Sequence, residues 1–265
     1  MTRSYQFIHR VREQSLYLNQ PDTWLLSDES RLPVLSCDQI VLGAKGNWKG
    51  LDWDFESYIK LYNGIAIDNS AWKNYVLSPD VFFKGDAYSY GFDIMLNKVF
   101  GQHNVSLSYT LSKTRYRIDN LDQKDEIASQ YDQLHEVKCY YEYRWKAFDV
   151  SLIWVYGSGR PFTAFYGYYD VANVGSDFTS IPIYGAINGV RLPAYHRLDL
   201  SLGYTLAREK ITWSLRGGVY NVYDRKNIRD IQYLAFPTDN GGNTIEKRNV
   251  AMIGRVPSLQ LTIAF

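Results

Sequence analysis

The last residues of the chain alternate strictly between apolar and mostly polar positions. The apolar positions are Leu259, Leu261, Ile263 and Phe265, and the positions opposite them are Ser258, Gln260, Thr262 and Ala264. Because successive side chains of a β-strand point to opposite faces, this segment predicts a strand with one apolar and one small polar face. In a soluble sandwich the apolar face packs on a core, whereas in a transmembrane barrel it contacts lipid.

Segments with this two-residue period recur along the whole sequence. They predict strands near residues 3–11, 34–46, 51–63, 87–99, 103–115, 131–145, 147–157, 191–206, 211–232 and 248–265. Most of them have ten residues or more. Strands of globular proteins usually have about 5–6 residues, whereas strands that cross a membrane need about 9–11. The predicted fold class is therefore all-β, and the strand lengths favour a membrane.

Charged side chains collect on one parity of these strands, even near the middle. In the segment 51–63, the residues Asp52, Asp54, Glu56 and Lys60 share one parity. An apolar core could not accommodate them, but a wet lumen or the solvent could. The three carboxylates could also suggest a cation site, although a solvated lumen face is the favoured interpretation. A soluble sandwich with its charged face outside gives the same pattern, so parity leaves both folds open.

The connections separate the two folds better. Short links at 46–50, around Gly101, around Lys146 and at 207–210 alternate with long ones at 64–86, 116–130, 158–190 and 233–247. Outer-membrane barrels have this alternation of short turns and long loops because every strand crosses the bilayer. Aromatic residues near the short turns or the C-terminus predict one interfacial girdle, made of Trp53, Phe100, Trp145, Phe148, Trp213 and Phe265. The girdle favours the membrane interpretation.

Two places depart from the pattern. The alternation in 211–232 is interrupted around Gly217 and Gly218, where a β-bulge is expected because glycine permits one. Pro257 falls within the last predicted strand, a position that tolerates proline only at a sheet edge or a bulge.

Composition narrows the classes of function. The net charge of +1 gives no argument for nucleic acid, and the 23 Tyr and 7 Trp suit an interface that is half apolar and half wet. No run approaches the ~18–20 apolar residues of a spanning helix, and residues 1–17 lack the apolar core of a signal peptide. Cys37 and Cys139 are expected to be unpaired thiols.

Four stretches of the sequence resemble the C-terminal part of TonB-dependent outer-membrane receptors. They are Tyr156-Gly-Ser-Gly-Arg-Pro-Phe162, Arg191-Leu-Pro-Ala-Tyr-His-Arg-Leu-Asp-Leu-Ser-Leu-Gly-Tyr204, Val219-Tyr-Asn-Val-Tyr-Asp-Arg-Lys226 and Gly254-Arg-Val-Pro-Ser-Leu-Gln-Leu-Thr-Ile-Ala-Phe265. Each stretch is moderately specific, and their common order covers the chain from about residue 36 to the end. The resemblance implies a 22-stranded antiparallel transmembrane β-barrel that encloses a plug and imports large nutrients with energy relayed by TonB.

Under this resemblance, residues 1–265 are expected to form a partial barrel of about ten strands, with the plug domain and the N-terminal strands absent. The expected location is the outer membrane of a Gram-negative bacterium. The resemblance also implies that Leu261, Ile263 and Phe265 form the signal read by the barrel-assembly machinery. Other expected partners are outer-membrane lipid and TonB, the latter only through a plug. It stays open whether a surface lipoprotein joins the loop side.

Two other functions remain as alternatives. A soluble carbohydrate-binding sandwich would stack its Tyr and Trp side chains on sugar rings. A barrel hydrolase would use His135 or His196, but no Ser occurs in a convincing partner motif. The four His have no metal-ligand spacing, and Gly157-Ser-Gly-Arg160 lacks the phosphate-loop pattern. We therefore expect no enzyme activity, cofactor or metal, and ligand contacts from the loops 158–190 and 64–86.

Overall fold

The computed structural model describes residues 1–11, 23–28, 32–68, 82–119, 126–172, 178–209, 211–237 and 243–265. Regular structure in these ranges consists of β-strands. The strands of the main sheet are β1 (Thr2–Gln6), β4 (Leu35–Trp48), β5 (Leu51–Asp68), β6 (Phe82–Phe100), β7 (His103–Ile118), β8 (Ile127–Ala128), β9 (His135–Trp145), β10 (Phe148–Gly157), β15 (Tyr195–Arg208), β16 (Ile211–Tyr220) and β19 (Val256–Ala264). The described residues contain no helix long and apolar enough to cross a membrane.

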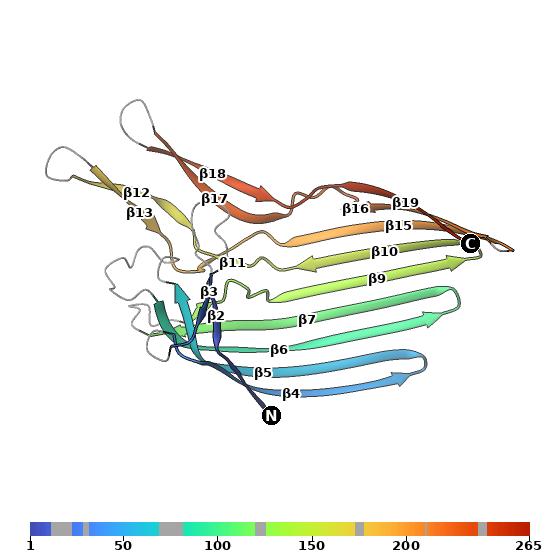
Figure 1. Ribbon diagram of the computed structural model, residues 1–265, viewed down its shortest axis with the longest axis horizontal. Helices are drawn as coiled ribbons and strands as arrows, with labels where there is room; N and C mark the ends of the chain where they lie inside the picture. The colour runs from blue at the N-terminus through green and yellow to red at the C-terminus, as the bar shows by residue number, and fades with distance from the viewer. Residues whose placement is uncertain are drawn as a thin grey trace.

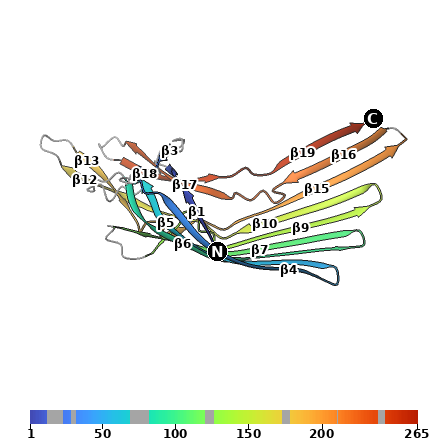
Figure 2. The same cartoon turned by 60° about the horizontal axis from the view of Figure 1, so that its bottom comes forward.

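Ten of these strands form one continuous path in the order β1-β4-β5-β6-β7-β9-β10-β15-β16-β19, and β8 pairs beside β7. Every neighbouring pair in the path is antiparallel. Figure 1 shows these strands side by side, and Figure 2 shows how the sheet curves across its width. The predicted all-β antiparallel fold is therefore confirmed.

Four two-residue turns join strands at one end of the sheet, at the right-hand side of Figure 1. They connect β4 to β5, β6 to β7, β9 to β10 and β15 to β16. The first residue of each turn, namely Lys49, Gly101, Lys146 or Glu209, has a φ between 43° and 58°. Tight hairpins favour such positive φ values because the backbone then matches the twist of the strands. The predicted short links are confirmed.

Longer connections leave the opposite end, which we call the loop side. They include four two-stranded sheets: β2 (Ile8–Val11) with β3 (Thr23–Leu26), β11 (Pro161–Phe162) with β14 (Val190–Arg191), β12 (Phe165–Ala172) with β13 (Phe178–Tyr184), and β17 (Ile228–Pro237) with β18 (Asn243–Ala251). Figure 1 shows β12–β13 and β17–β18 projecting beyond the main sheet. Parts of the predicted long loops, at 69–81, 120–125, 173–177 and 238–242, lie outside the described residues.

Several predicted strands are wrong in extent. Two of them begin later than predicted, since β9 starts at His135 rather than at 131 and β15 starts at Tyr195 rather than at 191. Three others are divided. The predicted strand 211–232 is divided into β16 and β17 by a turn, and the predicted strand 248–265 is divided into the end of β18 and β19. Near the N-terminus, the predicted strand 3–11 is divided because β1 pairs with β4 whereas β2 pairs with β3. Two of these breaks depend on hydrogen bonds between segments far apart in the sequence, such as Asn221 with Asp199 and Asp224 with Arg255, which a local two-residue period does not encode.

The expected bulge at Gly217 and Gly218 is also wrong. Both strands that flank β16 keep an unbroken register through these residues. Pro257 behaves as expected, since it pairs with Val219 at the start of β19, which bonds to β16 alone in the described sheet. An edge strand tolerates a residue without an N–H group because one side of its backbone needs no partner.

The register divides the side chains of the main sheet between two faces, because directly paired residues share a face. What we call the apolar face carries Ile40, Leu42, Phe55, Ile59, Leu96, Leu107, Leu111, Val150, Leu152, Trp154, Leu198, Leu200, Leu202, Leu206, Leu215, Leu259, Leu261 and Ile263. What we call the polar face carries Asp52, Glu56, Asp93, Ser106, Thr110, Glu142, Arg144, Asp149, Asp199 and Arg216.

The apolar face has no covering layer among the described residues. Leu202 is 52% exposed and Leu259 is 77% exposed. A sandwich needs a second sheet about 10 Å away, but the other sheets here are two-stranded hairpins. Apart from neighbours within a sheet, the most extensive contact between strands joins β2 to β5. The leucines of β15 therefore form an outward belt rather than a core, and the sandwich alternative is not the architecture observed.

The buried apolar core is small and lies at the loop side. It consists of Phe83, Ile127 and Ile187, against which Tyr116 and Ile118 pack. Tyr116 and Ile118 belong to the polar face of β7, so this core forms where the loop-side segments fold over that face. The rest of the sheet depends on its backbone hydrogen bonds and on whatever surrounds its two faces.

The aromatic residues predicted as a girdle lie close to the short turns. Phe100, Trp145, Phe148 and Trp213 are each between 45% and 51% exposed on the apolar face. Trp145 stacks on Phe148 across its turn, with 6.4 Å between ring centroids. Half-exposed aromatic rings at one height of an apolar surface are typical of a membrane interface.

Candidate functional site

The polar face of the sheet is the first candidate for function because strand alternation gathers hydrophilic groups there from nine strands. Over β9 to β16 its basic residues are paired with carboxylates: Lys138 with Glu136, Arg144 with Glu142 (2.8 Å), Arg197 with Asp199 (3.0 Å) and Arg216 with Asp149 (3.1 Å). In three of the four pairs the carboxylate is largely buried, with side-chain exposures of 12% for Glu142, 20% for Asp199 and 17% for Asp149. Their main effect is a hydrated wall with little net charge.

Arg197 is the most constrained of these cations. Its Nη1 donates to the hydroxyl of Tyr195 at 2.9 Å and to that of Tyr220 at 2.6 Å. The guanidinium also lies over the Tyr220 ring, 4.1 Å from the centroid. Since Asp199 neutralises it, this group can offer hydrogen bonds and a flat surface to a ligand without attracting it by net charge.

Acidic residues predominate on the other half of the polar face. Asp52, Asp54 and Glu56 project from β5 as predicted, and Glu56 is directly opposite Asp93 of β6. Thr110 donates a hydrogen bond to Asp93, and Asn47 donates one to Asp52 at 2.6 Å. Within the described residues no group of three or more His, Cys, Asp or Glu side chains has metal-binding geometry. These carboxylates belong to a hydrated face.

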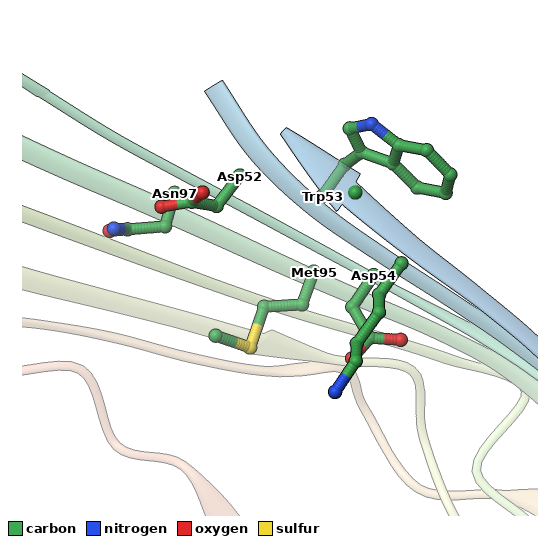
Figure 3. A pocket seen from close by; sticks show the side chains of 7 residues that line it. Asp52, Trp53, Asp54, Met95 and Asn97 are labelled. Atoms are coloured by element: carbon green, nitrogen blue, oxygen red, sulfur yellow. The ribbon is translucent and has the colours of Figure 1, made fainter. Parts of the chain in front are cut away.

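A hollow of ≈480 Å³ lies at the short-turn end of β5, lined by Lys45, Gly46, Asp52, Trp53, Asp54, Met95 and Asn97. Figure 3 shows Asp52 beside Asn97, with the indole of Trp53 on the other side of the strand. Trp53 lies over Gly46, where an added Cβ would come within 2.7 Å of the indole. The hollow pairs no nucleophile with a base, so its polar groups can bind but have no arrangement for covalent chemistry.

A buried cluster on the loop side joins segments that are far apart in the sequence. The side chain of Asp132 is 0% exposed, and its carboxylate pairs with Arg115 at 3.0 Å and with Arg191 at 2.5 Å. The same carboxylate accepts the backbone N–H of Thr114 at 2.8 Å. A buried carboxylate that accepts this many hydrogen bonds holds its neighbours in one arrangement.

The stretch Tyr156-Gly-Ser-Gly-Arg-Pro-Phe162 is part of this cluster. Arg191 donates to the carbonyl of Gly159 at 2.8 Å and to that of Asp132 at 3.0 Å. A Cβ at Gly159 would lie 1.6 Å from the carbonyl oxygen of Leu192, so only glycine fits. Sequence analysis missed Asp132 altogether, although the two stretches around Gly159 and Arg191 carried the signal. Gly159, Arg191 and Asp132 therefore have a structural role.

The stretch Val219-Tyr-Asn-Val-Tyr-Asp-Arg-Lys226 contains the turn that ends β16. Asn221 is fully buried with a φ of 53°, and its side chain bonds to both the N–H and the C=O of Arg225. Asn227 bonds in the same two-sided way to His196, and Asp224 accepts the N–H of Arg255 at 2.7 Å. These Asn and Asp side chains replace strand pairing and let the chain leave and rejoin the sheet.

Aromatic side chains join the two projecting hairpins at their base. Phe165 of β12 is buried and contacts Tyr168, Tyr184 and Tyr233, with centroid distances of 4.9, 5.4 and 5.2 Å. Burial raises the pKa of the Tyr184 hydroxyl. Nearby, Tyr166 is 69% exposed and Tyr169 is 51% exposed. This aromatic group is a surface on which planar or sugar-like ligands could stack.

The two histidines of the hydrolase alternative are not brought together with a nucleophile. His135 and His196 lie on the apolar face, separated by β10, where Tyr156 pairs with His196. Their rings bond to the hydroxyls of Tyr109 at 2.9 Å and Tyr223 at 2.8 Å. In the part of the chain that the structure describes, no serine hydroxyl bonds to either ring. Each His–Tyr pair therefore acts as a polar contact near the loop-side limit of the apolar belt.

The three predicted assembly residues lie at the free edge of the sheet. Leu261 pairs with Leu215 and Ile263 with Trp213, and both side chains are on the apolar face. Phe265 directly follows β19 and is fully exposed. The edge of β19 that faces away from β16 has no partner strand among the described residues. Unpaired backbone groups and an apolar row thus occur together on the last strand.

Comparison with known proteins points to one architecture. No protein-family model matches the chain, and no curated protein matches it either. Among solved structures, the ferripyoverdine receptor of the outer membrane of Pseudomonas aeruginosa superposes on 88% of the chain with a TM-score of 0.55 and 14% identity. The ferric-catecholate import receptor Fiu of E. coli superposes on 98% with a TM-score of 0.52 and 16% identity, and the ferric citrate transporter FecA on 87% with 0.52 and 11%.

The chain spans only 27%, 32% and 31% of the length of these three proteins. At such low identity the similarity establishes the fold alone. These structural neighbours are outer-membrane β-barrel receptors or transporters, which agrees with the sheet order, the short turns and the uncovered apolar face. The chain has the fold of a contiguous part of the wall of such a barrel.

Proposed function

We propose that residues 1–265 form the C-terminal part of the wall of a TonB-dependent receptor in the outer membrane of a Gram-negative bacterium. The observation that carries this proposal is the apolar face, which stays uncovered across the main sheet and ends in aromatic residues beside the short turns. In lipid such a face is favourable, because the inner strands of the sheet pair their backbone groups on both sides and present apolar side chains on this face.

The transport role follows from the two faces together. The polar face would line the lumen, where its paired charges give a hydrated wall that a nutrient can pass. The apolar face would contact lipid. Gating and coupling to TonB would need a plug domain supplied by another segment. The short turns would lie on the periplasmic side and the loop side would face the exterior, as in barrels with short periplasmic turns.

Ligand contacts would come from the loop side. The exposed Tyr166 and Tyr169 adjoin the aromatic group around Phe165, and this region belongs to the predicted ligand loop 158–190. The buried Asp132 cluster would hold the base of that loop, because Arg191 links it to the segment around Gly159. The second predicted ligand loop, 64–86, falls partly outside the described residues.

The last strand would mediate assembly. Leu261, Ile263 and Phe265 would form an apolar row that the barrel-assembly machinery recognises, and the free backbone edge of β19 would offer the hydrogen bonds of an added strand. A surface lipoprotein on the loop side is a further partner class for this architecture.

Fluorescent labelling of two neighbouring residues tests the membrane orientation. Single cysteines at Leu202 and Ser201 would be introduced after the natural Cys37 and Cys139 are changed to serine. In a receptor barrel that ends in residues 1–265 and is placed in lipid vesicles, a polarity-sensitive dye at position 202 should emit at shorter wavelength and be quenched by lipids that carry a quencher on the acyl chain. The dye at position 201 should stay accessible to a water-soluble quencher, because its side chain is on the polar face.

The comparison is internally controlled because the two positions are adjacent in one strand and occupy one depth. Equal access of the water-soluble quencher to both dyes would contradict the membrane orientation. Protection of position 201 rather than 202 would also contradict it, since it would reverse the proposed faces.

A further inference from the structure

The short-turn end of the sheet carries a row of cations on the apolar side. We call these residues the basic rim: Lys49, Lys98, Lys146 and Arg208. Lys98 and Arg208 are on the apolar face through their pairing with Leu51 and Ile211. Lys49 and Lys146 occupy turns, and their ammonium groups lie over the rings of Trp48 and Trp145, 5.2 and 5.1 Å from the centroids. Each of the four short turns thus has at least one cation in it or beside it, and the sequence of the last turn also contains Lys210.

The four short turns contain a single carboxylate, Glu209, whereas many cations elsewhere on the sheet have a carboxylate partner. Arg3, Arg115 and Arg117 at the loop side of the apolar face each pair with a carboxylate. On the polar face, the basic residues of β9 to β16 are paired as well. By contrast, none of the four cations of the basic rim forms an ion pair within the ranges that the structure describes. Cations that the protein leaves unneutralised attract anions from the surroundings.

Apolar side chains of the apolar face lie directly beside the basic rim. Leu96, Leu206 and Leu215 of the apolar face are only a few residues from the short turns, and the half-exposed Trp145 and Phe148 lie between belt and turns. In the proposed orientation this height is the boundary between acyl chains and headgroups. The two cation–π contacts hold the ammonium groups of Lys49 and Lys146 at the same depth as the indoles of Trp48 and Trp145. In a membrane, lipid phosphates lie at this depth.

We propose that the basic rim binds the phosphate groups of anionic phospholipids in the leaflet on the short-turn side. Successive short turns are separated by two strands, or about 10 Å, so the cations can engage separate headgroups. The proposal rests on the proposed function, because it requires that the apolar face contact lipid. Its specific content is a preference for anionic over zwitterionic headgroups, which membrane insertion alone does not require.

Lipid retention by the refolded chain tests the proposal. The full chain in zwitterionic detergent would be mixed with equal amounts of phosphatidylglycerol and phosphatidylcholine that have the same acyl chains. Native mass spectrometry would count the lipids that stay bound. The wild-type chain should retain phosphatidylglycerol preferentially. The preference should fall about fivefold for each cation removed, up to the quadruple variant K49Q/K98Q/K146Q/R208Q, and it should weaken as salt increases.

A matched control removes two cations from the polar face. Lys45 and Lys60 lie on that face at their register positions opposite Asp54 and Gln39, so the variant K45Q/K60Q should keep the wild-type preference. Far-ultraviolet circular dichroism would verify that each variant retains its strands. Equal retention of both lipids by the wild-type chain would overturn the proposal, as would an unchanged preference in the quadruple variant or an equal loss in the control.

The outcome for this proposal can be distinguished from the outcome for the membrane orientation. If the dye at position 202 is protected by lipid but the chain shows no headgroup preference, only the basic-rim proposal is refuted. If the dye at position 202 stays exposed to water in vesicles, the proposed membrane function is refuted, and so is the basic-rim proposal that depends on it.

Discussion

Asp132 is a carboxylate with no exposure to water, and two arginines from distant segments reach it. Such a group is costly to bury alone, so its arginine and amide donors must all be in place before the segment around it is stable.

Glu126 is a more exposed carboxylate that is also held by hydrogen bonds from other segments. Hydrogen bonds from Tyr88 and Arg117 lower the pKa of the Glu126 carboxyl, so this contact stabilises the loop at neutral pH and is lost as the pH falls through that lowered pKa.

The change Asp132→Asn should destabilise the loop side strongly. It removes the charge that Arg115 and Arg191 share, and breaking such a buried pair costs about 3–5 kcal/mol. Urea titration of the refolded chain would measure this loss. The matched control is Glu136→Gln, which breaks an exposed pair with Lys138 and should cost less than about 1 kcal/mol. Similar losses for both variants would show that burial of Asp132 is not the cause.

At the scale of elements, the alternation of apolar and polar residues decides which face of each strand is apolar, and the backbone conformation of the tight turns decides which residues pair. β15 has leucine at four alternate positions of the apolar face, from Leu198 to Leu202 and again at Leu206. A slip of one residue in register would move all of these side chains to the polar face. The two-residue turn between β15 and β16 prevents that slip by fixing which residues are paired.

The change Leu202→Arg should therefore cost far more than Ser201→Arg. An arginine near the middle of the lipid-facing belt destabilises a barrel by about 2–4 kcal/mol, whereas position 201 faces the polar side, where it neighbours Ser151 and Gly218. Reversible urea unfolding, in vesicles, of a receptor barrel that ends in residues 1–265 would give both values. If the arginine at position 201 proved the more harmful one, the assignment of the two faces would be wrong.

Sequence patterns predicted much of this element-level structure. The long strands, the four short turns and the side on which Leu200 or Asp52 lies all follow from a local two-residue period, which strand geometry imposes residue by residue. The breaks at residues 221–227 and 252–255 were not predicted, because the Asn221, Asp224 and Asn227 contacts that create them are made with distant strands. The Asp132 cluster was missed for the same reason.

At the scale of the whole molecule, the main sheet is open and both its edges are unfinished among the described residues. β19 has one neighbour, and β4 is paired on its outer side only between Leu35 and Gln39, by β1. Lipid does not tolerate unpaired backbone groups, so these edges must be matched by further strands in a membrane. The proposed assembly residues lie on one of these edges.

Truncation of the last side chain tests the assembly proposal in cells. In an outer-membrane preparation from a Gram-negative host, Phe265→Ala should reduce the amount of a receptor barrel that ends in residues 1–265 several-fold, because the exposed ring is then lost from the apolar row. Ala264→Ser, which changes the neighbouring position paired with Thr212 on the polar face, is the control. Equal amounts of both variants in the membrane would refute a recognition role for Phe265.

The order of the main sheet has one more consequence. Because each long strand pairs with the next long strand along the chain, every tight hairpin is a self-contained unit whose register is set by its own turn. A duplicated or deleted hairpin would change the circumference of a barrel by two strands and leave the pairing of all other strands intact. Pore width in proteins built this way is therefore open to change by evolution in discrete steps, without redesign of the wall that remains.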